Sequence, residues 1–304
     1  MVDSIINCQD SDKADCVILT AAYDRTASLG KGARNGGFAI VKCLHADVEF
    51  FDRYSLTQPC YIYKIAHKDL GVSNDLLPQQ MVEKICAVYY ELMKKEKLLM
   101  LLGGEHSVSI GAFRAISKKR VPENITIFHI DAHCDLRNDD SDSNPDPSSV
   151  SKFAHSCVMR RAHEMGFHLV QVGIRSYSKE EYTFFMGNDR IAIHEWGKGE
   201  PSSINQIIDS ISTEQVYISL DVDGIDPAHM PATGTPVPGG LEWYYTIELL
   251  RELITRKEII GADIVEVAPR ENDVLTQYGA ALLCYHIIGN NLLKKKPPAV
   301  LPWV

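Results

Sequence analysis

The chain has 304 residues, of which 45% are hydrophobic and 23% are charged, and its formal net charge is -9. This is the composition of a globular protein with enough apolar material for a large core. The acidic balance argues against nucleic acid as a partner and favours small cationic molecules.

Short apolar runs alternate with longer amphipathic stretches, which is the order of elements that builds a mostly parallel sheet from βαβ units. Strands are predicted at 17–20, 98–102, 125–130, 168–172, 216–220 and 264–267. Helices are predicted at 78–96, 107–119, 155–166, 243–256 and 274–293. Because no linker separates two halves, we expect an α/β fold in a single domain over 1–304, with its core at about 15–293.

The N-terminal segment and the cysteines bear on where the protein works. The first residues lack the regions of a secretory signal, and no apolar run is long enough to span a bilayer. The eight cysteines form no Cys-x-x-Cys pair, so neither a zinc knuckle nor a redox motif is present. We therefore expect a cytoplasmic protein without a membrane partner.

The strongest functional signal directly follows the predicted strand at 125–130. The chain there reads Asp-Ala-His-Cys-Asp, and residues two apart share one face of an extended chain. Asp131, His133 and Asp135 can therefore converge on one point.

A second group repeats this spacing at the end of the predicted strand at 216–220, where Asp221 and Asp223 share a face. A single Asp-x-Asp is more often an ordinary loop. Two such groups, one with a histidine, favour a metal site, because carboxylates buried together need cations to compensate them.

A sixth candidate ligand is His106, in the Gly-Gly-Glu-His-Ser segment that follows the predicted strand at 98–102. A lone histidine is more often structural, so the prediction of His106 as a ligand depends on the two carboxylate groups described above. The set holds four carboxylates and two imidazoles, from His106, Asp131, His133, Asp135, Asp221 and Asp223. Two divalent cations balance these charges, and ligation without thiolate suits Mn²⁺ best, with Zn²⁺, Co²⁺ and Ni²⁺ as alternatives.

Four segments in this order resemble the ureohydrolases, the family of arginase, agmatinase, guanidinobutyrase and formiminoglutamase. They are Gly-Gly-Glu-His-Ser at 103–107, Asp-Ala-His-Cys-Asp at 131–135, Ser-Leu-Asp-Val-Asp-Gly-Ile-Asp-Pro at 219–227 and Asp-Ile-Val-Glu-Val-Ala-Pro at 263–269. The resemblance implies an arginase-like fold with three α/β/α layers and hydrolysis of a guanidino compound to urea and an amine. It also implies two metal ions on the six ligands and assembly as a homo-oligomer, a trimer or a hexamer.

The resemblance implies roles for two further residues. His155 matches the family histidine that shuttles protons, and Glu266 matches the acid that pairs with the substrate guanidinium. Glu266 also stands out physically, because an unpaired charge between Val265 and Val267 in a buried strand would be costly.

Two departures argue against arginase activity. Arginases carry asparagine where this chain has Arg137, and an aspartate that holds the α-amino group where it has Ser178. Four aspartates in the loop at 139–146 are predicted near the site mouth, where they would attract a second cationic centre and repel an α-carboxylate. Agmatine is therefore the expected substrate, with aminopropylagmatine and guanidinobutyrate as alternatives. Formiminoglutamate is another, since Arg137 could bind its carboxylate.

Two other classes of function stay open on the sequence. One is a non-catalytic family member that keeps the metals as a scaffold, although no ligand is missing. The other is a single-zinc deacetylase on a related fold, which would need three ligands rather than six.

Overall fold

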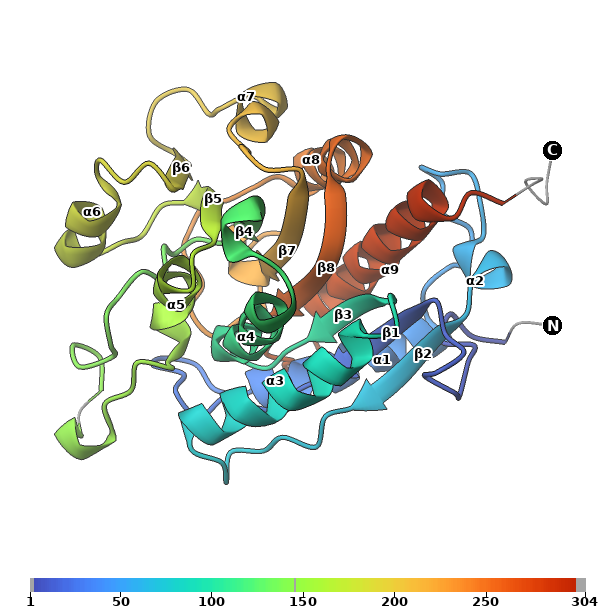
Figure 1. Cartoon of the computed structure of the whole chain (residues 1–304), viewed down its shortest axis with the longest axis horizontal. Coiled ribbons are helices and arrows are strands. Elements are labelled where there is room, and N and C mark those ends of the chain that lie inside the picture. The colour runs from blue at the N-terminus through green and yellow to red at the C-terminus, as the bar shows by residue number, and fades with distance from the viewer. Residues whose placement is uncertain (1–2, 145, 299–304) are drawn as a thin grey trace.

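The computed structural model describes residues 3–144 and 146–298 (Figure 1). Its centre is an eight-stranded sheet in the order β2-β1-β3-β8-β7-β4-β5-β6, in which all neighbouring strands run parallel. The strands are β1 Cys16–Thr20, β2 Ile65–Asp69, β3 Leu98–Leu102, β4 Ile125–Ile130, β5 His168–Ile174, β6 Ile191–Glu195, β7 Gln215–Asp221 and β8 Glu258–Val265. The predicted mostly parallel α/β sheet is confirmed.

Helices cover both faces of this sheet and make three layers (Figure 1). Helices α1, α7, α8 and α9 bury apolar side chains in one core, and α3, α4 and α5 do so in the other. Alternate residues of β1 feed the two cores, with Cys16 and Ile18 in the first and Val17 and Leu19 in the second. The helices are α1 Gly36–Ala46, α2 Pro59–Ile62, α3 Pro78–Met93, α4 Ser109–Lys119, α5 Val158–Glu164, α6 Lys179–Phe185, α7 Ile204–Asp209, α8 Trp243–Arg256 and α9 Leu275–Lys295.

Two strands and one long helix were not predicted from the sequence. β2 and β6 are the edge strands, and their sequences lack a long apolar run. All of the β6 side chains and the last three of β2 are at least partly exposed. α1 begins with two glycines, which are unfavourable inside a helix. A Cβ on Gly36 would lie 2.2 Å from the carbonyl oxygen of Val267, so glycine allows this helix to approach the end of β8.

The predicted last strand is displaced. β8 begins at Glu258 and ends at Val265, so Glu266 lies just after the strand rather than inside it. None of the described helices is long and apolar enough to cross a membrane.

The arrangement of the four central strands positions the candidate site. β3, β8, β7 and β4 are consecutive neighbours in the sheet, and each of them ends at a segment that carries predicted site residues. The carboxyl ends of parallel strands meet at one edge, where ligands of open α/β sheets bind.

Candidate metal centre and active site

His106 lies directly after β3, in the turn that leads into α4. A Cβ on Gly104 would lie 1.8 Å from the carbonyl oxygen of Tyr23, so only glycine fits at this point of the turn. The N–H of Gly104 donates to the carbonyl of Ala21 at 2.8 Å, and its carbonyl accepts from the N–H of Glu266 at 2.9 Å. These bonds fix the turn and leave the His106 imidazole buried at the ends of the central strands.

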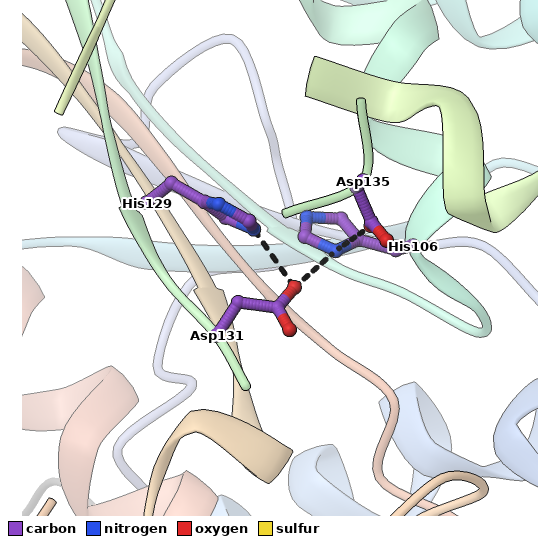
Figure 2. Close-up of side chains that lie close together, drawn as sticks. All are labelled: His106, His129, Asp131 and Asp135. Carbon is purple, nitrogen blue, oxygen red and sulfur yellow. Dashed lines mark hydrogen bonds and ion pairs between the residues drawn. The ribbon is translucent and has the colours of Figure 1, made fainter. Parts of the chain in front are cut away.

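Three carboxylates surround Nδ1 of His106. It lies 3.2 Å from Oδ2 of Asp131, 3.2 Å from Oδ2 of Asp135 and 3.5 Å from Oδ2 of Asp221. Figure 2 shows the first two carboxylates beside the imidazole. Nδ1 is buried and has no hydrogen-bond partner among the described residues. A buried ring nitrogen that faces only carboxylate oxygens is the arrangement that a cation would complete.

The opposite nitrogen of His106 shows which tautomer the site selects. Oγ of Ser219 donates to Oδ1 of Asp263 at 2.8 Å, so it accepts from Nε2–H of His106 at 2.9 Å. Burial lowers the pKa of His106, but the three carboxylates around Nδ1 outweigh it and raise that pKa well above the usual value, so Nδ1 is protonated in the metal-free protein. A bound cation would displace this proton and take the lone pair of Nδ1. A hydrogen bond on the far nitrogen, as Nε2–H makes here, is typical of histidines that ligate metals.

A second group of side chains adjoins the first and shares Asp131 with it. Nδ1 of His133 lies 3.4 Å from Oδ1 of Asp131 and 3.2 Å from Oδ2 of Asp223. Oδ2 of Asp131 faces His106 and Oδ1 faces His133, so the two oxygens of this one carboxylate face the two imidazoles. The N–H of Asp223 donates to Oδ1 of Asp221 at 2.9 Å, which ties the two carboxylates of the β7 end together. The structure therefore brings all six predicted ligands into one cluster.

His129 was missed by the sequence analysis, which placed it in a strand without a role. Its Nε2 lies 2.8 Å from Oδ2 of Asp131. Figure 2 draws this contact as a dashed line. The side-chain amide of Gln171 donates to the carbonyl of Cys134 at 2.8 Å and to Nδ1 of His129 at 2.7 Å. His129 therefore accepts on Nδ1 and donates from Nε2, so it supports Asp131 rather than offering a lone pair to a metal. Its spacing of two residues from Asp131 was the available signal.

The site groups shift one another's protonation. Burial raises the pKa of Asp135 and Asp221, and the neighbouring carboxylates raise both further. Burial lowers the pKa of His133, but the carboxylates of Asp223 and Asp131 outweigh it and raise that pKa to about 12. Protons thus compensate the crowded carboxylates in the metal-free protein. Divalent cations would displace these protons and compensate the same carboxylates, so the residues fit a pair of such ions.

Two site residues adopt a backbone conformation that side chains other than glycine rarely take. The φ angle is 51° at Asp135 and 65° at Glu266. The left-handed backbone turns each carboxylate in a direction that it would not have in a helix or a strand. Such strain is typical of functional sites and is maintained by the surrounding structure.

His155 and Glu266 lie close together beside the cluster. Nδ1 of His155 is 3.9 Å from Oε1 of Glu266. The backbone N–H of His155 donates to Oγ1 of Thr26 at 3.1 Å, and that hydroxyl donates to Oε1 of Glu105 at 2.6 Å. Thr26 and the fully buried Glu105 were not predicted, and they hold His155 in place.

A cavity of about 280 Å³ opens onto this group. Its walls combine predicted ligands, the predicted catalytic histidine and several hydroxyls, including His133, Asp135, Asp221, His155, Ser28 and Tyr177. Arg137 also lines it, but its guanidinium forms an ion pair with Asp142. Ser178 lines it as well and caps α6, where its Oγ accepts from the N–H of Glu181 at 3.2 Å.

Comparison with known proteins agrees with this geometry. The model of the arginase family matches residues 14–289. This chain belongs to the arginase family. It is 33% identical over 285 residues to N(1)-aminopropylagmatine ureohydrolase of Synechocystis sp., covering 91% of this chain and 89% of the relative. It is 33% identical over 289 residues to an agmatinase of Pyrococcus horikoshii, covering 92% and 93%.

Solved structures of the arginase family have the same fold. The agmatine ureohydrolase of Thermoplasma volcanium superposes with a TM-score of 0.82 at 27% identity, covering 97% of each chain. The predicted arginase-like fold is therefore confirmed. As a ureohydrolase of this family, the chain is a hydrolase of carbon–nitrogen bonds in linear amidines.

Proposed function

We propose that this enzyme holds two divalent ions, Mn²⁺ by preference, and hydrolyses agmatine to urea and putrescine. The ions would bind to the six clustered side chains, which are His106, Asp131, His133, Asp135, Asp221 and Asp223. The single observation that carries the proposal is the position of Asp131, whose two oxygens face the imidazoles of His106 and His133. A carboxylate shared in this way suits two adjacent cations better than one.

The donor atoms of the cluster favour Mn²⁺. Four carboxylates and two imidazoles without a thiolate form a mostly hard ligand set, which suits manganese. When bound, two such ions supply Lewis acidity and make water nucleophilic near neutral pH.

Glu266 is the group proposed to orient the substrate. Its carboxyl is 3% exposed, and burial followed by the charge of Glu105 raises its pKa well above the usual value. A cationic guanidinium beside Glu266 would lower the pKa of this carboxyl again, so that it ionises. The resulting carboxylate would then bind the guanidinium by an ion pair. Fixing the guanidinium carbon in this way supplies proximity to the attacking water.

His155 is proposed to move the proton. In the metal-free protein, burial, followed by the cationic His133, lowers the pKa of His155 to about 4, so its imidazole is neutral at pH 7 in that form. A new bond forms between the water oxygen and the guanidinium carbon, and a water proton passes to His155. The carbon–nitrogen bond to the alkyl amine then breaks as His155 returns that proton to the leaving nitrogen, and the remaining hydroxyl proton passes to the released amine. Urea and the amine result, and His155 is regenerated.

Agmatine is favoured over arginine because the two residues at the positions where arginases differ, Arg137 and Ser178, are both engaged with other groups of the described chain. The hydroxyl of Ser178 is engaged as a helix cap, and Arg137 is paired with Asp142. Aminopropylagmatine is the second candidate. The cavity shares Ser28 and Ser143 with an adjoining cavity of about 870 Å³, which could receive a longer amine.

A urea-release assay tests the proposed reaction. The Mn²⁺-loaded protein is given agmatine, aminopropylagmatine, guanidinobutyrate and arginine in parallel, and formiminoglutamate is followed by release of formamide. We expect the highest kcat/KM with agmatine. A higher value with aminopropylagmatine would reassign the substrate, and the absence of urea from every guanidino compound would contradict the proposal.

We also propose that the chain acts as a single ureohydrolase domain that assembles as a trimer or hexamer in the cytoplasm. The family resemblance supports the assembly. Light scattering should give three or six times the chain mass of 34.0 kDa. A mass of one chain would contradict it.

A further inference from the structure

Arg137 is the one positively charged side chain on the wall of the candidate active-site cavity, among the described residues, apart from its histidines. It lies two residues after Asp135, so the same bend that directs that carboxylate also carries the guanidinium to the cavity. A free guanidinium here would attract a substrate that ends in a carboxylate. Its partners therefore bear on which substrates the cavity accepts.

Two carboxylates pair with Arg137, and they differ in how firmly they are held. Nε of Arg137 lies 3.9 Å from Oε2 of Glu181. Glu181 is 3% exposed and fixed, because Oε1 accepts from the N–H of Leu136 at 3.0 Å and Oε2 from the N–H of Ser178 at 2.7 Å. The carboxylate of Glu181 is therefore held rigidly in the wall of the cavity.

Asp142 is the second partner, and its carboxylate forms an ion pair with Nη1 of Arg137. Its side chain is 54% exposed and lies on the surface loop at 139–146. Asp142 does not line the cavity itself, so it acts through Arg137. One cation and two carboxylates leave this group with a net charge of -1, which suits a cationic substrate tail.

Two other loop aspartates accept hydrogen bonds within or beside the loop and also line the adjoining cavity, so the action of the loop aspartates near the site mouth stays a prediction. Asp140 is only 4% exposed and accepts from the N–H of Ser151 at 2.7 Å. Asp146 accepts from the N–H of Ser148 at 2.9 Å, so it holds a turn of the loop itself.

We propose that Asp142 is a specificity-determining residue that keeps Arg137 neutralised and thereby excludes guanidino substrates with a carboxylate tail. This inference rests on the proposed function and assigns selectivity at the same site. A carboxylate substrate could use Arg137 only by displacing Asp142, whereas agmatine requires no such exchange.

The test compares agmatine with 4-guanidinobutyrate, which share the guanidinium but end in an amine and a carboxylate. In Asp142→Asn, the ratio of kcat/KM for 4-guanidinobutyrate to that for agmatine should rise about threefold, the scale of an ion pair with an exposed partner. Asp146→Asn is the matched control and should leave the ratio unchanged. Combining Asp142→Asn with Arg137→Gln should remove the gain, because the freed cation is then absent.

Calorimetric binding of both compounds to the same Mn²⁺-loaded variants separates this inference from the proposed reaction. If Asp142→Asn leaves both the kinetic ratio and the ratio of Kd values at the wild-type level, the selectivity role of Asp142 is overturned. If no urea is released but the ratio of Kd values shifts toward 4-guanidinobutyrate, the selectivity role stands and the proposed reaction fails.

Discussion

The backbone N–H of His106 donates to Oε1 of Glu266 at 2.9 Å, which joins the segment after β3 to the segment after β8. The same carboxylate oxygen lies 3.9 Å from Nδ1 of His155. The proposed substrate-orienting group is therefore fixed by the backbone of a proposed metal ligand. This link allows the charge of Glu266 to be changed without losing the bond that positions it.

Glu266→Gln should damage substrate binding and leave the fold intact. The amide oxygen can still accept from His106, but the charge that holds the guanidinium is lost. A hydrogen bond to a charged group contributes about 1.5–3 kcal/mol, so kcat/KM should fall by about 10- to 100-fold. Urea release, with manganese content and thermal midpoint as controls, measures this. A variant with wild-type kcat/KM would remove Glu266 from the mechanism.

His155→Asn should lower kcat by about 100-fold, the scale of a proton-transfer residue. In the metal-free protein, burial, followed by the cationic His133, lowers the pKa of the His155 imidazole to about 4, so it is unprotonated at pH 7. Manganese content should be unchanged. His163→Asn on α5 is the matched control. Normal turnover of the His155 variant at every pH would show that another group moves the proton.

Ser219→Ala tests the support of His106. The change removes the acceptor of Nε2–H and also leaves Asp263 without its serine donor. Loss of such a supporting bond typically weakens metal binding by about 10- to 100-fold. Metal-binding titration should show this loss, and excess Mn²⁺ should restore kcat. Ser117→Ala, on α4, should bind manganese normally, and equal affinity in the two variants would contradict the supporting role.

Manganese uptake should strengthen as pH rises from 6 to 8. The pKa of His133 is raised to about 12 in the metal-free protein, because the carboxylates of Asp223 and Asp131 outweigh the effect of burial. Its proton is therefore still bound throughout this range and must leave when a cation binds. Affinity should rise by about tenfold per pH unit for each proton displaced. Titration calorimetry in buffers of different ionisation enthalpy should detect proton release, and a pH-independent affinity would exclude this competition.

The ligands at the ends of the central strands could be predicted from the sequence because both signals there, the apolar run and the polar residues two apart, are local. Asp131, His133 and Asp135 follow an apolar run at a spacing of two, and the structure brings all three into one cluster, with a left-handed bend at Asp135. The edge strands β2 and β6 could not be predicted, since half-exposed strands need no continuous apolar run. The position of Glu266 was also missed, because its left-handed φ is imposed by contacts between distant segments.

The supporting residues were harder to find for a related reason. Ser219 and His129 each lie two residues before a predicted ligand, but serine and histidine are common in strands without any role. Only the fold shows that Ser219 meets Asp263 and that His129 meets Gln171. The pairing of Arg137 with Asp142 likewise depends on the path of the loop and not on its composition.

The central claim is a binuclear centre, and counting metal ions against activity tests it most directly. Metal-free protein is titrated with Mn²⁺ while elemental analysis and urea release from agmatine are followed together. We predict that full activity requires two ions per chain, and that Asp221→Ala loses most activity and is poorly rescued by excess metal. Full activity with one tightly bound ion per chain would contradict the binuclear model.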